Sequence, residues 1–487
     1  MSREILINIT PMETRVALVE NGVPQEISIE RNQKRGLVGN IYKAIVVRVL
    51  PGMQAAFLDI GEQRTAFLHV DDLHHLDAES GQKADIQQLL RTGQQILVQV
   101  IKDAISSKGA RLTAQLSLAS RYLVYMNGND HIGLSQRIED EQERERLKEI
   151  IETTAAESGL GESGGFIVRT AADAVEASAL QSDMRYLHRL WLHIESSKSE
   201  AKAPSCIHEE LPLYKRALRD MASDEVEKIL VDSREVLDKL TSFANKFSPE
   251  IANLIEHYPG ERPLFYLHGI EDEIAKALHR SVPLKSGGHL VIDQTEAMTT
   301  VDVNTGAFVG HRNLEETIYK TNLEAAVAVA RQLRMRNLGG IIIVDFIDMQ
   351  SAEHRRQVLR SFEKALGRDR AKTAISGVTE LGLVQVTRKR TSESLGQVLC
   401  EGCPTCDGRG SIKSAETVGY EVLREILRVA RAYECDQLRV LACHAVIERL
   451  LDEDSAQVAD LEAFIGCTIQ FRAESLFARD QFDIIPV

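Results

Sequence analysis

Residues 289–304 read HLVIDQTEAMTTVDVN, and residues 340–349 read GIIIVDFIDM. Both segments are rich in β-branched residues, which is typical of strands, yet each contains an acidic residue within its apolar run: Asp302 in the first and Asp345 in the second. A carboxylate in such surroundings is costly unless it is paired, hydrogen-bonded or bound to a cation. We therefore expect these two acids to bind a metal ion for phosphate chemistry.

The sequence around the two acids predicts a strand, a helix and a second strand. Side chains two residues apart in a strand share a face, so Asp302 and Asn304 should project together. After Asn313 the apolar spacing predicts a helix, and Gly339-Gly340 ends it before the strand that leads to Asp345. Ligands gather at strand ends in α/β arrangements of this kind.

The donor atoms offered here are of the kind that Mg²⁺ prefers. Two carboxylates and an amide supply oxygen ligands, and a bound cation can polarise a phosphoryl oxygen and offset developing charge. The sequence leaves open the alternative that Asp302 and Asp345 only cap turns or pair with arginines. Asp348 is a weaker candidate, because it could equally be a helix cap.

Composition limits the class of protein. The chain has 487 residues, 44% hydrophobic and 27% charged, as expected of several globular domains. No apolar run approaches the roughly 20 residues that span a bilayer, and the start, MSREILINIT, lacks a signal-peptide core, so we expect a cytoplasmic protein without a membrane span. The net charge of −14 argues against a nucleic-acid binder, but local basic runs such as Arg388-Lys389-Arg390 weaken that argument.

Residues 39–113 are strand-rich and resemble an S1 domain, a five-stranded OB-type barrel that binds single-stranded RNA. The resemblance rests on the segments GNIYKAIVVRVLPGMQAAFLDIG and AFLHV. It implies that Phe57 and Phe67 stack on bases, with Lys108 and Arg111 near the RNA backbone. The alternative is that both phenylalanines fill the barrel core.

A second candidate phosphate site lies in GGFIVRT, residues 164–170. Here Arg169 and Thr170 follow a short apolar strand. Arginine supplies a fork of donors and threonine a hydroxyl, which together suit a terminal phosphate. The simpler alternative is an ordinary surface ion pair.

Three of the seven cysteines crowd into CEGCPTCDGRG, residues 400–410. The turn from Cys403 to Cys406 can place two thiolates on one Zn²⁺, and a structural zinc takes four ligands. Either Cys400 and a remote residue complete the site, or another subunit supplies a second pair. A reduced, solvent-facing turn is the alternative.

The order of these segments, over essentially all 487 residues, resembles the ribonuclease E/G family. The G type is favoured over the E type, because no long C-terminal extension follows. The most specific segments are SGGHLVIDQTEAMTTVDVNTGAFVGHRN, NLGGIIIVDFIDM, TRKRTSESL and CPTCDGRG.

The resemblance implies an Mg²⁺-dependent endoribonuclease that hydrolyses single-stranded, AU-rich RNA to 5′-phosphate and 3′-hydroxyl ends. The residues that match the family's catalytic positions are Asp302 and Asp345, which bind Mg²⁺, and Asn304, which assists. The implied substrates are messenger RNA, in decay, and ribosomal RNA precursors, at the 5′ end of 16S RNA.

Two further features follow from the same resemblance. Arg169 and Thr170 match a sensor of the RNA 5′-monophosphate, which stimulates cleavage. Cys403 and Cys406 match a pair that shares one structural Zn²⁺ across the interface of a homodimer. The chain departs from some members at Lys372, where they carry an arginine near the 5′ end, and in the loop 127–130.

The implied fold is a multidomain combination of α/β and β parts, in which an S1 barrel is inserted into an RNase H-like domain. The expected ranges are 1–38 and 213–280 (RNase H-like), 39–120 (S1), 121–212 (5′ sensor), 281–399 (DNase I-like catalytic domain), 400–413 (zinc link) and 414–487 (small α/β dimerisation domain).

Two other functions remain open from the residues alone. One is an RNA-binding scaffold whose acidic strands are structural, and the other is a metal phosphoesterase for a small substrate. The pair Asp302 and Asp345 discriminates against the first, because a protein that only binds RNA has no need for paired acids facing it. The S1-like segment and the chain length count against the second.

Overall fold

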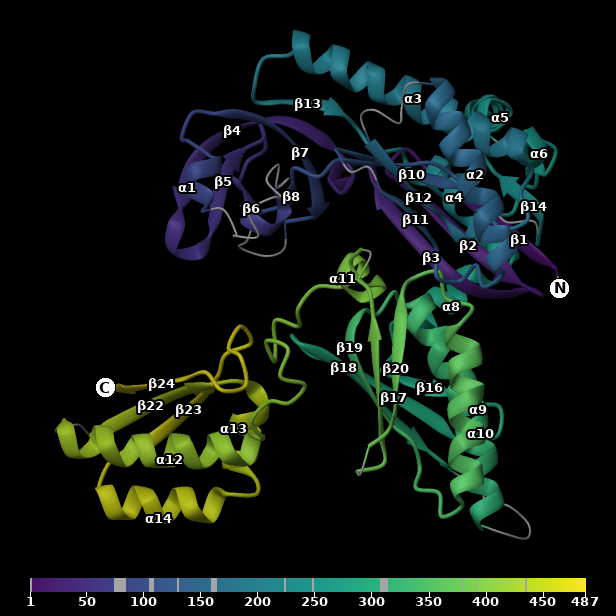
Figure 1. Ribbon diagram of the computed structural model, residues 1–487. Helices are drawn as coiled ribbons and strands as arrows, with labels where there is room; N and C mark the ends of the chain where they lie inside the picture. Colours follow the sequence, from purple (N-terminus) through teal and green to yellow (C-terminus); the bar gives the residue numbers. More distant parts are fainter. Residues whose placement is uncertain are drawn as a thin grey trace. The chain divides into compact units, whose positions relative to one another are not determined.

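The computed structural model describes residues 2–73, 85–104, 109–128, 131–158, 164–222, 225–247, 249–306, 314–379, 381–390, 392–433 and 436–487 (Figure 1). These residues form two compact units, 1–398 and 399–487. In the described part of the chain, no helix has the length and apolar character needed to cross a membrane.

The first sheet combines two distant parts of the sequence. Three antiparallel strands come from residues 3–31, with a left-handed turn at Asn21 and Gly22 (φ 50° and 75°). The strand β14 then adds in parallel to β1, with Ile229 opposite Ile5. The elements are β1 (Arg3–Ile9), β2 (Glu13–Glu20), β3 (Val23–Arg31), β14 (Val226–Val231), β15 (Ile255–His257), α4 (Leu213–Met221), α5 (Arg234–Phe247), α6 (Pro249–Ala252), α7 (Leu264–Leu267) and α8 (Ile270–Ala277).

The second sheet closes into a five-stranded barrel, which confirms the barrel expected for residues 39–113. The strand order is β4-β5-β6-β8-β7, and β7 pairs back with β4. Residues 205–208, far along the chain, form β13 and pair with the other edge of β4. The elements are β4 (Ile41–Leu50), β5 (Ala55–Asp59), β6 (Ala66–His69), α1 (Ile86–Leu89), β7 (Gln95–Lys102), β8 (Arg111–Thr113) and β13 (Ser205–His208).

The third sheet packs against α3 through a cluster of three aromatic rings. The ring centroid of Tyr125 lies 5.5 Å from that of Phe166 and 5.7 Å from that of Trp191. A side chain at Gly164 would come within 2.6 Å of the Tyr125 ring, so this strand requires glycine there. The elements are β9 (Ser117–Ala119), β10 (Leu123–Asn127), β11 (Ile132–Leu134), α2 (Glu141–Ser158), β12 (Gly164–Val168) and α3 (Ala177–Glu200).

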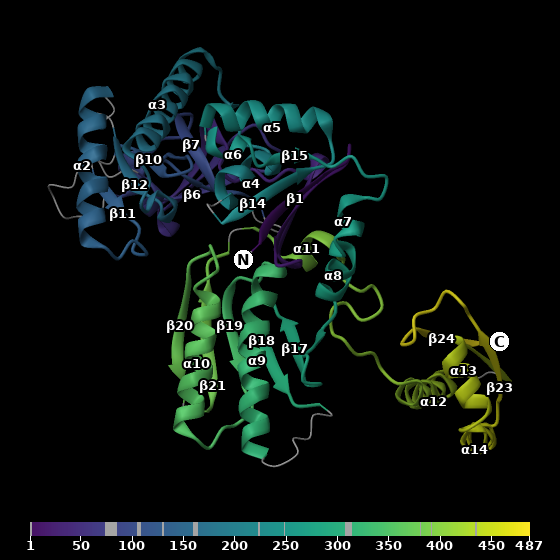
Figure 2. The same ribbon diagram turned by 90° about the vertical axis from the view of Figure 1, so that its right-hand side faces the viewer.

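The fourth sheet carries the two acids and confirms the predicted strand–helix–strand unit. Strand β17 is antiparallel to β18, and β18 is parallel to β19. Figure 2 shows α9 and α10 side by side along the sheet, and apolar side chains such as Val301 and Val344 pack under them. The strand order is β16-β17-β18-β19-β21-β20. The elements are β16 (Ser281–Pro283), β17 (His289–Gln294), β18 (Met298–Asn304), α9 (Leu314–Met335), β19 (Gly340–Asp345), α10 (Ala352–Leu366), β20 (Thr373–Val378), β21 (Leu383–Arg388) and α11 (Leu395–Leu399).

The unit 399–487 is a small α/β domain, as expected from the sequence. Its central strand β22 pairs in parallel with β23 and antiparallel with β24. Residues such as Val422, Ile426 and Val440 form its core. The elements are α12 (Ala415–Ala432), β22 (Gln437–Ala442), α13 (His444–Leu451), α14 (Ser455–Ile465), β23 (Thr468–Ala473) and β24 (Phe482–Pro486).

Candidate active site

The two acids lie side by side on the sheet face opposite the helices. Asp302 and Asp345 are direct partners in the register of the parallel strands β18 and β19. Their neighbours Val301, Val303 and Val344 are buried under α9 and α10, so alternation along the strands turns both carboxylates outward, where they are exposed. The sequence therefore placed the pair on the correct strands and on one face.

Asn304 lies on the same face of β18. Its Nδ2 donates a hydrogen bond to Asp302 Oδ2 at 2.9 Å. This hydrogen bond orients the Asp302 carboxylate. It does not involve Asp302 Oδ1 or Asn304 Oδ1. The predicted grouping of Asp302, Asn304 and Asp345 is thus present in the structure.

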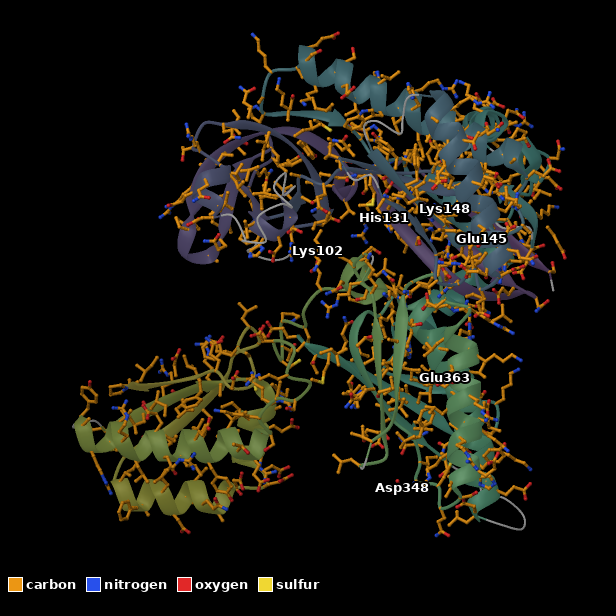
Figure 3. All side chains as sticks on the ribbon, viewed as in Figure 1. Lys102, His131, Glu145, Lys148, Asp348 and Glu363 are labelled. Carbon is orange, nitrogen blue, oxygen red and sulfur yellow. The ribbon has the colours of Figure 1, made fainter. Side chains whose placement is uncertain are left out.

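The negative charge of this cluster is not balanced by an ion pair in the described part of the chain. Partial burial raises the pKa of the Asp345 carboxyl, and the carboxylates of Asp302 and Asp348 raise it further. Among the described residues, none of these three acids forms an ion pair with a lysine, arginine or histidine. Figure 3 labels Asp348, which follows β19 in the chain and acts electrostatically on Asp345. The sequence had ranked it below the other two acids.

These residues fit a hydrated divalent cation. Their donors are carboxylate and amide oxygens, and the surplus negative charge is what a cation would neutralise. In the described ranges, no three or more His, Cys, Asp or Glu side chains lie together so that they could hold a metal ion, so the protein would supply two carboxylates and an amide. Mg²⁺ keeps several water ligands, so an open pair of acids suits it better than a cage.

A recess of about 300 Å³ lies beside Asp348, at the end of the sheet. Leu381 and Val378 of the β20–β21 hairpin line one side, and Arg355 of α10 contributes a positive charge. Leu381 is 82% exposed. No pattern in the sequence indicates this recess, because its walls come from three separate segments.

The two phenylalanines of the barrel lie together on its outer surface. Phe57 and Phe67 are register partners on β5 and β6, with ring centroids 6.0 Å apart in an edge-to-face arrangement. Neither ring belongs to the barrel core, which other residues fill. The alternative that both are core residues is therefore wrong.

Arg111 is next to Phe67 in the register of β6 and β8. Its guanidinium is already engaged, because Nε and Nη2 both donate to Asp72 Oδ2, at 3.0 and 2.8 Å. Lys108, the other cation expected here, lies outside the described residues. The role of these side chains toward RNA stays a prediction.

Two further residues of this surface were missed. Arg48 is exposed and lies opposite Phe57 in the register of β4 and β5. His69 is stacked on Phe67, with centroids 6.5 Å apart and planes 29° apart. Both could have been found from the alternation of side chains in the segments VVRVL and FLH.

Arg169 is held by both of its terminal nitrogens. Nη1 donates to the carbonyl oxygen of Ser120 at 2.6 Å, and Nη2 donates to Asp220 Oδ1 at 2.9 Å. Thr170 Oγ1 lies 2.9 Å from Ser135 Oγ. The structure thus brings Arg169 and Thr170 to a polar corner that already contains a carboxylate.

The Asp220 carboxylate is stabilised in its charged form. Burial opposes its ionisation, but Arg219 and Arg169 outweigh that effect and lower the pKa of Asp220. Arg370 also reaches this corner, since its Nη1 donates to the Asp220 carbonyl oxygen at 2.9 Å. These arginines line a cavity of about 700 Å³. The sequence pointed to Arg169 but gave no sign of Asp220 or Arg370.

The cysteine turn contains two thiols and lies in the unit 399–487. Cys403 is exposed, and hydrogen bonds from the backbone N–H groups of Cys406 and Thr405 lower the pKa of its thiol. The backbone N–H of Asp407 closes the turn on the Cys403 carbonyl at 2.8 Å. Cys400 is exposed and forms no metal cluster with the pair among the described residues. A turn of this kind offers half of a zinc site.

The chain is similar to known proteins along its whole length. The model of the ribonuclease E/G family matches residues 117–391, and that of the RNase E/G thioredoxin-like domain matches residues 402–487. The chain is 52% identical to ribonuclease G of Escherichia coli (strain K12) over 492 residues, covering 100% of both chains.

Two other relatives extend the comparison. Ribonuclease G of Haemophilus influenzae is 50% identical over 99% of each chain. Ribonuclease E of Escherichia coli (strain K12) is 36% identical over 94% of this chain and 44% of its own. The chain therefore belongs to the ribonuclease E/G family, as the sequence motifs indicate.

Proposed function

We propose that this endoribonuclease hydrolyses phosphodiester bonds of single-stranded, AU-rich RNA in an Mg²⁺-dependent reaction that leaves 5′-phosphate and 3′-hydroxyl ends. The observation that carries the proposal is the in-register pair Asp302 and Asp345, exposed on one sheet face with a charge that no described cation balances. Such a pair destabilises the metal-free protein and is explained if a divalent cation binds it.

In this proposal Asp302 and Asp345 hold the Mg²⁺, and Asn304 fixes the Asp302 carboxylate through the 2.9 Å hydrogen bond. The metal, when bound, polarises the scissile phosphate and stabilises the charge that develops on it. The exposed position of both acids lets an extended RNA strand approach the sheet face. The recess beside Asp348 gives a neighbouring nucleotide room to turn away from the sheet.

The barrel supplies single-strand binding in this proposal. Phe57 and Phe67 offer adjacent ring surfaces on the barrel exterior, and aromatic side chains bind unpaired bases by stacking. Duplex RNA hides its bases, so this mode of binding selects single strands. Arg111 and Lys108 would contact the RNA backbone, Arg111 in competition with Asp72.

Arg169 and Thr170 are proposed to bind the 5′-monophosphate of the RNA and thereby stimulate cleavage. A phosphate accepts hydrogen bonds from a guanidinium and a hydroxyl together. Arg169 Nη2 and Thr170 Oγ1 are the groups that would be shared with it, since both now bond to protein side chains, Asp220 and Ser135.

Cys403 and Cys406 are proposed to bind one structural Zn²⁺ together with the same pair of a second copy, which makes the protein a homodimer. The support is the chemistry of the turn: it presents two thiols, the pKa of Cys403 is lowered, and zinc takes four ligands. The domain 414–487 is proposed to dimerise. The proposed substrates, messenger RNA and precursors of ribosomal RNA at the 5′ end of 16S RNA, place the protein in the cytoplasm.

The test is cleavage of a short AU-rich oligoribonucleotide, with and without Mg²⁺, in 5′-phosphate and 5′-hydroxyl forms. We expect cleavage only with Mg²⁺, faster on the 5′-phosphate form, and lost in Asp302→Asn. The matched control is Asp293→Asn, which changes an aspartate of β17 that is paired with Arg280 at 2.5 Å. RNA binding that persists without any cleavage by the native chain would support a scaffold and overturn the proposal.

A further inference from the structure

The segment that joins β19 to α10 carries Asp348 and begins directly after Asp345. Asp345 is held in β19 by its pairing with β18 and β21, but a loose segment after it would leave Asp348 free to move away from Asp345. Ile347 lies between Asp345 and Asp348 in the chain. One side chain forms hydrogen bonds with both the backbone N–H and the carbonyl oxygen of Ile347. That side chain is Asn322 of α9.

The contact is a two-point bond between an amide and a peptide. Asn322 Nδ2 donates to the Ile347 carbonyl oxygen at 2.7 Å, and the Ile347 N–H donates to Asn322 Oδ1 at 3.1 Å. This is the pattern that a neighbouring strand would supply, at a point where β19 has already ended. The two hydrogen bonds fix the position and the orientation of the backbone at Ile347.

Asn322 is fully buried, and its neighbours on the helix include the apolar core residues Ala325 and Ala326. A buried amide is costly unless its donor and acceptor are both satisfied. An apolar residue would be the simpler choice for this layer between helix and sheet. The polar residue is therefore explained by what it binds, which is the acid-bearing segment.

The same helix also binds the segment at a second point, closer to α10. Glu315 of α9 accepts hydrogen bonds from the backbone N–H groups of Gln350, at 3.3 Å, and Ser351, at 3.2 Å. Asp348 thus lies between two anchor points, Ile347 and Gln350, that both belong to α9. A third acceptor on this helix, Glu324, holds the Ser286 N–H at 3.1 Å in the turn before β17.

We propose that Asn322 is a positioning residue of the metal site: through Ile347 it fixes the segment that follows Asp345, so that Asp345 stays beside Asp302 and Asp348 stays close enough to add its negative charge to the site of a divalent cation. The inference rests on the proposed function and adds to it a residue that touches neither the cation nor RNA. Loss of Asn322 should weaken cation binding. The rate of cleavage should fall only because less cation is bound.

The test replaces Asn322 by leucine, which fits the buried volume and removes both hydrogen bonds. We expect the Mg²⁺ concentration for half-maximal cleavage to rise by roughly 10- to 100-fold, the usual effect of removing a group that supports a metal ligand. Cleavage should recover at high Mg²⁺. Mn²⁺ binding, measured by electron paramagnetic resonance without RNA, should weaken by a similar factor.

The matched control is Thr321→Val, one position earlier on the helix. Thr321 is also fully buried, but its hydroxyl bonds only to the Thr317 carbonyl of its own helix, at 3.0 Å. This variant should bind Mn²⁺ as the native chain does. If Asn322→Leu fails to fold, Glu315→Gln tests the second anchor in a partly exposed position, with a smaller shift expected in the same direction.

The outcomes separate the two proposals. The positioning role alone is overturned if the native chain binds Mn²⁺ and needs Mg²⁺ while Asn322→Leu binds Mn²⁺ equally well. Where Asn322→Leu does not fold, unchanged Mn²⁺ binding in Glu315→Gln has the same meaning. A native chain that cleaves equally well without Mg²⁺ overturns the proposed function and the inference with it. Weakened Mn²⁺ binding in the Asn322 variant, together with native binding in Thr321→Val, supports the inference.

Discussion

The acid face of the sheet β16–β21 and the corner around Arg169 differ in how their charge is balanced. On the sheet, Asp302 and Asp348 add to the burial that raises the pKa of Asp345, and no described cation pairs with them. At the corner, Asp220 receives hydrogen bonds from Arg169 and Arg219, and these outweigh its burial and lower its pKa. One site is left unbalanced, while the other is neutralised within the chain.

This difference teaches what each site requires of its ligand. A cation that binds the acid face relieves repulsion and displaces no protein contact. A phosphate that binds Arg169 has to share or replace the hydrogen bond from Nη2 to Asp220. We therefore expect the first site to govern whether cleavage occurs at all and the second only to modulate it.

The largest effect is expected from Asp345→Asn. Cleavage should fall by roughly 10²- to 10⁴-fold, because a metal's stabilisation of the transition state is worth several kcal/mol and about 1.36 kcal/mol corresponds to tenfold in rate. The measurement is single-turnover cleavage at saturating Mg²⁺. Native rates in this variant would mean that the unbalanced charge has no catalytic purpose.

The same variant should be more stable than the native chain when metal is absent. The pKa of Asp345 is raised in the folded protein, so its ionisation opposes folding. The metal-free native chain should lose stability as pH rises through that pKa, and Asp345→Asn should remove this loss. Thermal unfolding in EDTA across a pH series checks the sign.

A smaller effect is expected from Arg169→Ala. The preference for 5′-phosphate over 5′-hydroxyl RNA should disappear, a change of roughly 5- to 150-fold if the coupling has the usual size, whereas cleavage of 5′-hydroxyl RNA should stay near native. The control is Arg216→Ala, which breaks a different arginine–carboxylate pair, with Glu30 at 2.6 Å. A retained preference would locate the sensor elsewhere.

Asp348→Asn should act in the same sense as Asp345→Asn but more weakly. Removing one negative charge lowers the attraction for Mg²⁺, and we expect roughly tenfold weaker cleavage at low Mg²⁺. It also removes a cause of the raised pKa of Asp345, so that Asp345 ionises at lower pH. The acid side of a pH profile of Mn²⁺ binding should move to lower pH, and a shift to higher pH would contradict this.

The smallest effect is expected from Asp220→Asn, which removes the carboxylate that competes for Arg169. The preference for 5′-phosphate RNA should increase by less than about fivefold, because a partly exposed ion pair is worth up to about 1 kcal/mol. The free energy of unfolding should decrease by about 1 kcal/mol, since Arg219 also loses one of its charged partners and keeps Glu210. An unchanged preference would show that Asp220 and the phosphate do not compete.

The sequence predicted well those features that local pattern determines. The closed barrel and the strand–helix–strand unit around Asp302 and Asp345 are confirmed. Alternation along a strand also placed Asn304 with Asp302, and the 2.9 Å contact agrees. Each of these features depends either on residues that are close in the chain or on a sequence motif that lies within a single domain.

The sequence could not predict partners that lie far apart in the chain. Asp220 and Ser120 meet Arg169 from positions 51 and 49 residues away, and Asn322 meets Ile347 across 25 residues. Nothing in the local pattern of α9 distinguishes Asn322 from a surface polar residue. Such contacts depend on how whole elements pack, which is why the sequence pointed to candidate site residues but not to the residues that support them.

The parallel pairing of β1 with β14 has a consequence for how the protein is made. Asn8 and Asp232, hydrogen-bonded at 2.5 Å, are 224 residues apart. At a synthesis rate of about 5–20 residues per second, the first strand waits on the order of ten to forty seconds for its neighbour to leave the ribosome. During that time the inserted barrel can fold, while one edge of β1 stays open. Translation therefore completes the innermost inserted domains first and the enclosing sheet later.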